Sequence, residues 1–542
     1  MDKFLIKTKK LMFSQQGGIF SSALIMSIMI IVSRFFGFLR LRVLSSYFTA
    51  NELDLYFASF RIPDIVFEIL ITGALTSAFV PIYIKYQNNK KDLWVNISSI
   101  INLLTLILFI FIFIIFIFLD KLVFLMTPGY SAEKSATIVY YSRILLLGQL
   151  PFLVIGNFLT AMGQANKSFL ITSLAPIIYN LAVIFTTVLW AGKIHLFAPI
   201  LGIVLGAFLF LLIQLPIPFI FNFQYLFIIR ITEGLKHFFR MVIPRVFTVL
   251  TSQVDATIDL TLTTLISNGS YTIFYLAQHL QLLPISVIGI SFGQASLPYL
   301  SEIYQNKKID QLKNLIIDSI LNLFFLTIPI ASFFIFSRTP LVRLFFGGQK
   351  FDWQATVLTA YTISCFAISI PFHSIYYFLT RCFYALLDSR TPFYISLISI
   401  AINTFFSLIF ILFFKLPVWS LALSFSIAIS FSVISLFYIL SRRLINLNFS
   451  FLIKETTKIV IITIIASLIS YFSIKILDGL IFDTSRTINV FFLLSTVAII
   501  YLFVYLFLAW LINIKELYLI SKLLIKTKEY KNKILAIYST YD

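Results

Sequence analysis

Charged residues are scarce in this chain of 542 residues, where Asp, Glu, Lys and Arg together make up only 12%. Hydrophobic residues make up 60%, and the mean hydropathy is +0.99. A soluble domain cannot bury that much apolar surface. The composition therefore excludes an ordinary soluble fold and predicts that lipid surrounds much of the chain.

Cysteine and histidine are also rare. Cys365 and Cys382 both lie in apolar stretches, which argues against a disulfide framework. The four histidines lack the spacing of metal ligands, and we find no G-x-x-x-x-G-K-[ST] motif for ATP hydrolysis. We therefore expect neither an enzyme nor a resident metal or cofactor.

The charge that is present is strongly basic, with a formal net charge of +19. No nucleic-acid-binding motif interrupts the apolar pattern, so nucleic acid is not an expected partner. A surplus of Lys and Arg is instead typical of the cytoplasmic loops of membrane proteins. The apolar run from Gly17 to about Phe36 is longer than the core of a cleaved signal peptide, and it predicts a retained first span.

Long apolar runs dominate the chain. A spanning helix needs about 20 mostly apolar residues, and these runs do not alternate as barrel strands do. We expect an all-α integral membrane protein with fourteen transmembrane helices. The candidate spans are 18–46, 55–84, 94–126, 135–163, 168–191, 196–222, 238–267, 271–303, 311–337, 353–386, 390–414, 416–441, 454–477 and 487–513.

The connecting segments indicate the orientation. With the N-terminus inside, the cytoplasmic segments carry 25 Lys and Arg and the outer segments carry 10. This asymmetry predicts that both termini are cytoplasmic, with residues 515–542 forming a basic cytoplasmic tail.

One segment of the sequence occurs twice in similar form. The stretch 151-PFLVIGNFLT-160 returns as 371-PFHSIYYFLT-380, and further matches occur at nearly the same offset, such as 173-SLAPIIYN-180 with 396-SLISIAIN-403. We expect two parallel six-helix repeats, an N-lobe (1–228) and a C-lobe (229–445), followed by an additional helix pair (446–514). Two similar bundles facing a cleft favour a transporter, while a scaffold for other proteins stays open as an alternative.

Charges inside the spans indicate where a substrate binds, because each costs about 2.5–3.5 kcal/mol to insert. Arg34, Arg40 and Arg61 lie in or near the first two spans. Arginine reads phosphate through two parallel hydrogen bonds, which suggests an anionic, phosphate-bearing substrate. Gly37 and Pro63 are candidate hinges beside these arginines. The alternative to substrate binding is that an arginine side chain snorkels to the membrane interface, and we prefer this interpretation for Arg42.

The seventh and eighth spans carry different chemistry. Asp255 and Asp259 are four residues apart and share a helix face, which suggests a cation or proton site or, alternatively, pairing with an arginine. His279 lies in the eighth span, where its protonation could change near neutral pH, although a lone histidine is more often a packed residue.

Several motifs resemble those of the MurJ (MviN) lipid II flippases, which belong to the multidrug and oligosaccharidyl-lipid exporter superfamily. The resemblance rests on 33-SRFFGFLR-40, 60-FRIPDIVFEILITGALTSAFVPIY-83, 127-TPGY-130, 284-PISVIGISFGQASLPYLSE-302, 345-FFGGQKFD-352 and 384-YALLDSRTP-392. It implies two six-helix lobes, a cationic central cavity and a final helix pair that forms a groove for a polyprenyl tail. It also implies a bacterial cytoplasmic membrane location.

The resemblance assigns roles to individual residues. Arg34 and Arg40 match the arginines thought to hold the diphosphate of lipid II, Arg61 matches a basic position on the second helix, and Asp54 an acidic one before it. Asp259 and Asn403 resemble parts of a cation site. The chain departs from the family where Leu41, Phe67, Glu68, His279 and Ser407 replace expected charged residues.

The sequence thus predicts a flippase that moves lipid II, or a related polyprenyl-diphosphate lipid, by alternating access. Coupling to Na⁺ or protons is left open, and membrane lipids and cell-wall synthesis proteins are candidate partners. The alternatives are an exporter of another lipid-linked oligosaccharide, a drug-cation antiporter of the same superfamily, and a non-transporting scaffold for cell-wall enzymes.

Overall fold

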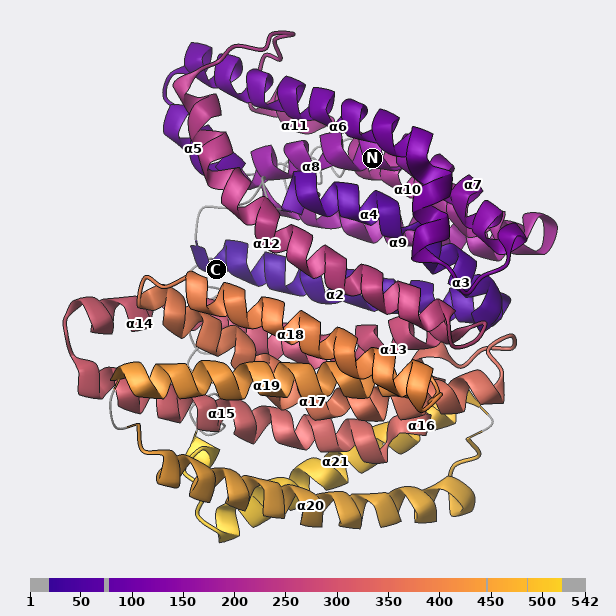
Figure 1. Ribbon diagram of the computed structural model, residues 1–542, viewed down its shortest axis with the longest axis vertical. Helices are drawn as coiled ribbons and strands as arrows, with labels where there is room; N and C mark the ends of the chain where they lie inside the picture. The colour runs from indigo at the N-terminus through magenta and orange to yellow at the C-terminus, as the bar shows by residue number, and fades with distance from the viewer. Residues whose placement is uncertain (1–18, 73–77, 445–446, 485, 519–542) are drawn as a thin grey trace, which may run out of the picture. The chain divides into compact units, whose positions relative to one another are not determined.

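The computed structural model describes residues 19–72, 78–444, 447–484 and 486–518, and within these ranges every regular element is a helix (Figure 1). The all-α prediction is confirmed. Eleven helices in the described part of the chain are long and apolar enough to cross a membrane. The protein is therefore a multi-pass membrane protein.

Three of the fourteen predicted spans are not among these eleven helices. They correspond to the helix Ile19–Tyr47, to the broken segment from Ala50 to Tyr86, and to the helix Glu233–Thr264. These are the segments that carry the predicted intramembrane charges Arg34, Arg40, Arg61, Asp255 and Asp259. The count of fourteen stays a prediction.

The chain forms two compact units, and each is described by itself. Unit 1 holds the chain up to Thr272 together with Phe345–Ala355. Its helices are α2 (Ile19–Tyr47), α3 (Ala50–Ser59), α4 (Arg61–Phe67), the π-helical η1 (Glu68–Thr72), α5 (Val80–Tyr86), α6 (Lys90–Met126), α7 (Ala132–Gly148), α8 (Leu150–Ala165), α9 (Phe169–Ile194), α10 (Phe197–Leu212), α11 (Pro216–Ile220) and α12 (Glu233–Thr264).

Unit 2 holds Ile273–Leu344 and the chain from Thr356 onward. Its helices, some of which begin or end in unit 1, are α13 (Ser270–Pro284), the π-helical η3 (Ile285–Ile290), α14 (Ser291–Gln305), α15 (Ile309–Phe336), α16 (Arg338–Phe346), α17 (Trp353–Ala385), α18 (Arg390–Leu408), the π-helical η4 (Ile409–Phe413), α19 (Trp419–Leu444), α20 (Phe449–Leu480) and α21 (Thr487–Leu511).

Helix α12 packs with unit 1, against α6, α4 and η1. The sequence-based boundary assigns it instead to the C-lobe, which begins at residue 229. The two compact units therefore differ from the predicted lobes at this helix and at Phe345–Ala355, and unit 2 also includes the final helix pair. The lobe boundaries stay a prediction.

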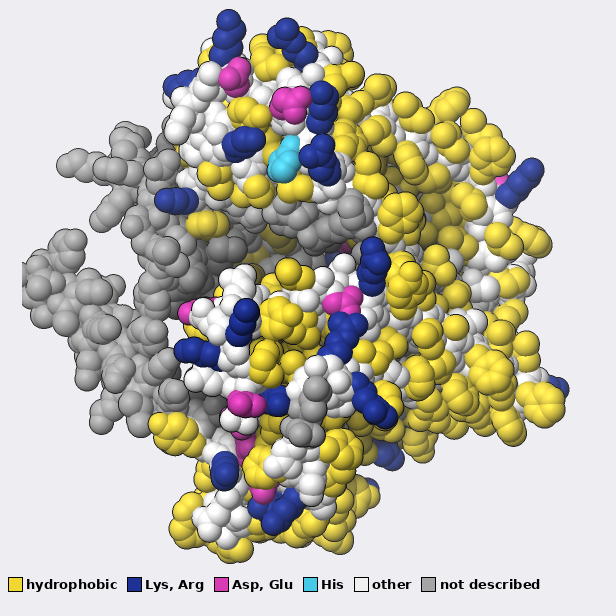
Figure 2. All heavy atoms as spheres, turned by 60° about the vertical axis from the view of Figure 1, so that its left-hand side comes forward, with side chains coloured by type: hydrophobic (Ala, Val, Ile, Leu, Met, Phe, Trp, Pro, Cys, Tyr) yellow, Lys and Arg dark blue, Asp and Glu magenta, His cyan; other side chains and the backbone are white. Residues whose placement is uncertain are grey.

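The helix flanks are apolar, as a lipid environment requires. On α6, Phe109, Phe113 and Ile117 are each more than half exposed. Figure 2 shows Lys and Arg side chains gathered where helices end, beside flanks that are almost entirely hydrophobic. Exposed apolar side chains on this scale are tolerated where hydrocarbon replaces water.

Small residues allow close helix packing in unit 1. A Cβ atom added at Gly202 on α10 would lie 2.1 Å from Thr186 Oγ1 on α9, and one at Gly206 would lie 2.9 Å from the carbonyl oxygen of Tyr179. Such contacts are typical of membrane helices, which associate through shape rather than hydrophobicity. Because α2 packs along α9, this tight pair supports the helix that carries the predicted arginines.

Candidate functional site

Helix α2 carries two of the predicted substrate-binding residues. Arg34 is exposed and Arg40 is half-buried. The helix runs without interruption through Gly37, and a Cβ atom added there would meet no described atom within 4 Å. Packing therefore does not require the glycine, and its role as a hinge stays a prediction.

The chain does break near the other predicted hinge, Pro63. Helix α3 ends at Ser59, and α4 begins at Arg61. Proline has no N–H, so Pro63 leaves the carbonyl of Ser59, four residues earlier, without its helical donor. The hydroxyl of Ser142 on α7 donates to this carbonyl at 2.9 Å, so the break is stabilised by a neighbouring helix.

Arg61 is buried and binds α12. Its Nε donates to Thr257 Oγ1 at 3.1 Å, and its Nη2 donates to the carbonyl and the side-chain oxygen of Gln253 at 2.7 and 2.5 Å. These bonds join the second predicted span to the seventh. In this structure Arg61 holds α12 in place, and its role in substrate binding stays a prediction.

Charges of both signs gather around Arg61. Asp64 on α4 lies within electrostatic reach of Arg61, Glu68 and Arg40. Tyr271 lies within reach of Arg61, Asp64, Asp259 and Asp54. Unit 1 therefore contains a mixed charged site in which the arginines from α2 and α4 are partly balanced by carboxylates.

Asp54 on α3 is fully buried and accepts four hydrogen bonds. Its donors are the hydroxyl of Tyr130 at 2.9 Å, the amide of Gly269 at 2.6 Å, and the amide and hydroxyl of Thr272, both at 2.8 Å. Burial raises the pKa of Asp54 to about 6, although these hydrogen bonds lower it. Asp54 thus joins α3 to the loops after α6 and α12 and to the first turn of α13, and its part in substrate binding stays a prediction.

The remaining predicted residues fall on both units. In unit 1, Asp255 is half-buried and Asp259 is buried, both on α12. In unit 2, Nδ1 of His279 contacts the carbonyl oxygen of Tyr275 at 2.9 Å. Asn403 and Ser407 are buried one turn apart on α18. Ser407 Oγ has no hydrogen-bond partner among the described residues, which leaves an oxygen available for a ligand.

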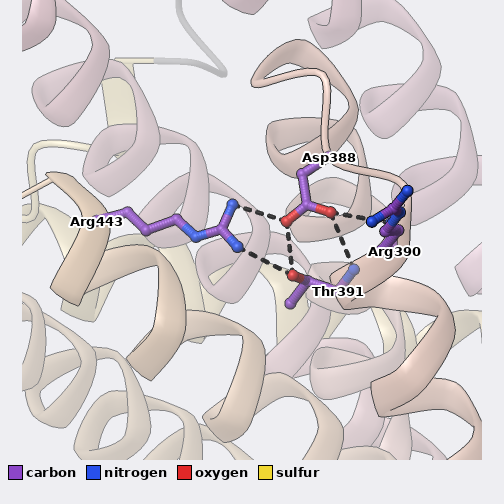
Figure 3. Close-up of polar contacts among 4 residues, drawn as sticks. All are labelled: Asp388, Arg390, Thr391 and Arg443. Atoms are coloured by element: carbon purple, nitrogen blue, oxygen red, sulfur yellow. Dashed lines mark hydrogen bonds and ion pairs between the residues drawn. The ribbon is translucent and has the colours of Figure 1, made fainter.

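The motif around Asp388 forms a charged turn between α17 and α18 (Figure 3). Asp388 accepts hydrogen bonds from the amides of Arg390 and Thr391 and from the Thr391 hydroxyl, at 2.9, 3.0 and 2.6 Å. Arg443, at the end of α19, forms an ion pair with Asp388 at 2.7 Å and donates to the Thr391 hydroxyl at 3.1 Å. Partial burial would raise the pKa of Asp388, but the bonds from Thr391 and the charge of Arg443 outweigh it and lower the pKa to about 2.

An apolar groove lies between α15 and α21 in unit 2. Its volume is about 340 Å³. An apolar cavity of about 150 Å³ already binds benzene, so this groove has room for part of a hydrocarbon chain. The lining residues include Phe325, Pro329, Phe333, Tyr501 and Tyr505.

The sequence did not reveal several of these contacts. Gln253 and Thr257 are uncharged residues 192 and 196 positions from Arg61, and Thr272 is 218 positions from Asp54. Their only sequence signal is that polar residues recur within apolar helices, at positions where lipid contact would be costly.

Solved structures with the same fold define the class of protein. One is an inward-facing multidrug resistance MATE family transporter of the MOP superfamily, with a TM-score of 0.65 and 13% identity over 80% of this chain and 99% of that chain. Another is a lipid II flippase MurJ in an inward closed conformation, with a TM-score of 0.74 and 25% identity over 90% of this chain and 98% of that chain. The chain therefore has the fold of a MOP-type membrane transporter.

Sequence comparisons identify the family within that class. Residues 44–492 match the family model for lipid II flippase MurJ. A probable lipid II flippase MurJ of Borreliella burgdorferi is 24% identical over 435 residues, covering 79% of this chain and 84% of the relative. One of Rickettsia prowazekii is 27% identical over 402 residues, covering 71% and 77%. The chain belongs to the MurJ family of lipid II flippases.

Proposed function

We propose that this protein moves lipid II across a bacterial cytoplasmic membrane by alternating access. The observation that carries the proposal is the family match over residues 44–492, which extends through both units. The family consists of transporters, so the protein's work is binding and conformational change rather than covalent chemistry.

The headgroup diphosphate would bind at the arginines of the first helix. Arg34 is exposed and Arg40 is half-buried on α2, whereas the guanidinium of Arg61 is occupied by hydrogen bonds to α12. A planar guanidinium suits a diphosphate because it donates two parallel hydrogen bonds. Arg61 would serve by positioning α12, and would bind substrate only after leaving Gln253 and Thr257.

The polyprenyl tail would lie at the final helix pair. The groove that supports this proposal is lined by α15 and α21, so of this pair α21 would shape the groove, together with α15. Its apolar surface suits a hydrocarbon chain, which gains no hydrogen bonds and needs only shape and hydrophobic contact.

The proposed fold has two parallel six-helix repeats and a final helix pair, fourteen helices in all, with both termini inside. Two matching features support the repeat. The second predicted span contains the π-helical segment Glu68–Thr72, and the eighth contains Ile285–Ile290. π-Helical segments are rare in proteins overall, but those that occur are often at functional sites. Parallel repeats placed on either side of a substrate would allow one lobe to rock against the other.

A coupling cation or proton would bind oxygen ligands, and each unit offers its own candidates. In unit 1 these are the carboxylates of Asp255 and Asp259 on α12. In unit 2 the candidate is the buried hydroxyl of Ser407, beside Asn403 on α18, which has no partner among the described residues. Hard monovalent cations or protons fit these groups. The inward movement of one charge through about 100 mV would supply about 2.3 kcal/mol.

The test replaces Arg34 and Arg40 by alanine, singly and together, and measures lipid II translocation in proteoliposomes. Each charge-assisted hydrogen bond contributes about 1.5–3 kcal/mol, so we expect translocation to fall about ten- to a hundredfold per arginine. Arg42→Ala is the matched control on the same helix, and it should retain activity.

Two outcomes would contradict the proposal. Full complementation of a depleted host by the double variant would favour the scaffold alternative. If native mass spectrometry finds another lipid-linked sugar on the purified protein and no binding of added lipid II, then lipid II is not the substrate.

A further inference from the structure

Helix α15 contains a proline that removes one backbone hydrogen bond, and a different helix supplies the missing donor. Pro329 lies inside Ile309–Phe336. Because proline has no N–H, the carbonyl of Phe325, four residues earlier, loses its helical donor. In lipid, such a carbonyl cannot turn to water instead, so another protein group must satisfy it.

Two tyrosines on α21 supply the hydroxyls. Tyr505 donates to the carbonyl of Phe325 at 2.8 Å, and Tyr501 donates to the carbonyl of Pro329 at 3.0 Å. Both side chains are almost fully buried, at 3% and 5% exposed. Since they are four residues apart on one helix, their hydroxyls meet two carbonyls that are also one turn apart.

The helix pair α20–α21 is attached to α15 at further points. Ser467 on α20 contacts Ser332 on α15 through their hydroxyls. Beyond α15, Arg343 on α16 donates to the carbonyl of Thr484 in the loop between α20 and α21. Ile459, Ile462 and Ala466 of α20 share one buried core with Phe325, Tyr501 and Tyr505.

We propose that Tyr501 and Tyr505 are positioning residues that make α20 and α21 one rigid body with α15, so that the groove between α15 and α21 keeps its shape during transport. This inference rests on the proposed function. A slide of α21 by half a turn would separate both hydroxyls from their carbonyls. It would leave the Phe325 carbonyl without any donor in a region without water, so the tyrosines oppose that movement.

The first experiment is a double-mutant cycle measured as melting temperature in detergent. Tyr505→Phe keeps the ring and removes the hydroxyl, so it should lower the melting temperature. Pro329→Ala restores an N–H for the Phe325 carbonyl, and in that background Tyr505→Phe should cost at most half as much. If Tyr505→Phe costs equally in both backgrounds, the assignment of Tyr505 is wrong.

Tyr501→Phe is the matched control for the cycle. Its hydroxyl meets the carbonyl of Pro329, whose helical donor would be the amide of Phe333 rather than of residue 329. Pro329→Ala therefore should not reduce the cost of Tyr501→Phe. An equal reduction for both tyrosines would show a general loosening of α15 instead of a replaced hydrogen bond.

The second experiment tests the rigid body during transport. In a variant with Cys365→Ala and Cys382→Ala, the pair Ser332→Cys and Ser467→Cys is oxidised to link α15 to α20. We expect lipid II translocation within twofold of the reduced protein. Loss of translocation on oxidation, restored by reductant, would overturn the inference.

If the proposed function itself is wrong, the two experiments would give a different set of results. The unmodified protein would then show no lipid II translocation at all, with or without a cross-link. The melting-temperature cycle does not depend on transport, and it would still decide whether the tyrosines fix α21 to the proline of α15.

Discussion

Two turns, one in each unit, adopt the same backbone with different side-chain chemistry. Lys167 after α8 has a φ of 61°, and Leu387 after α17 has a φ of 59°. In both turns the next amide donates to a carbonyl five residues back, Ser168 to Gly163 at 2.8 Å and Asp388 to Phe383 at 2.9 Å. Each is a helix-ending turn of the Schellman type, made here without glycine.

The polar residue that anchors each turn differs. In unit 1, Asn166 donates to the hydroxyl of Tyr83 at 3.0 Å, and all groups are neutral. In unit 2, Asp388 caps α18 and pairs with Arg443. A neutral anchor holds two helices of a buried core together, whereas a charged anchor joins two helix ends that remain partly exposed to water. The two turns thus share one backbone shape, but different side-chain contacts stabilise them.

The comparison predicts its largest effect at the charged turn. Asp388→Ala removes the cap of α18 and the partner of Arg443, which should reduce the free energy of unfolding by about 2 kcal/mol. Asn166→Ala removes the neutral hydrogen bond to Tyr83 and a longer one from Gln87 at 3.4 Å, and it should cost about 1 kcal/mol. Thermal melts in detergent compare the two variants. Equal losses would mean that the charge adds nothing to the turn.

Asp388 and Asp54 should affect the stability of the protein in opposite ways as the pH falls. The pKa of Asp388 is about 2, below the ordinary value of about 3.9, so its contribution is present above pH 4 and is lost as pH falls toward 2. The pKa of Asp54 is about 6, so the folded state binds the extra proton and stability rises as pH falls from 7 to 4.5.

Melting temperatures of the wild type and two variants measure this difference. Relative to Asp54→Asn, the wild type should gain stability between pH 7 and pH 4.5. Relative to Asp388→Asn, it should keep a constant advantage over the same range. An advantage over Asp54→Asn that does not change with pH would show that Asp54 does not take up a proton there.

A small effect, similar to that of Asn166→Ala, is expected beside Pro63, the other proline that leaves a carbonyl without its helical donor. Ser142→Ala leaves the Ser59 carbonyl beside Pro63 without its donor, which should cost about 1 kcal/mol. The combination with Pro63→Ala should remove most of that cost, because the introduced alanine would supply the missing N–H. A melting-temperature cycle checks this, and full additivity of the two changes would contradict it.

The sequence predicted much of the fold because apolar length is a local property. Eleven spans and the chain break near Pro63 follow from residues that are close in sequence. The partners of Arg61 and Asp54 could not be predicted, because Gln253 and Thr272 lie about two hundred residues away and carry no charge. Their positions depend on how α12 and α13 pack, which no local pattern records.

The hydroxyl of Tyr505 has a consequence for how the protein is made. It satisfies a carbonyl that leaves the ribosome 180 residues earlier, which at about 5–20 residues per second is a delay of about 9–36 seconds. During that interval α15 enters the bilayer with an open backbone group. A chain that stops before α21 would therefore leave this carbonyl without the Tyr505 donor.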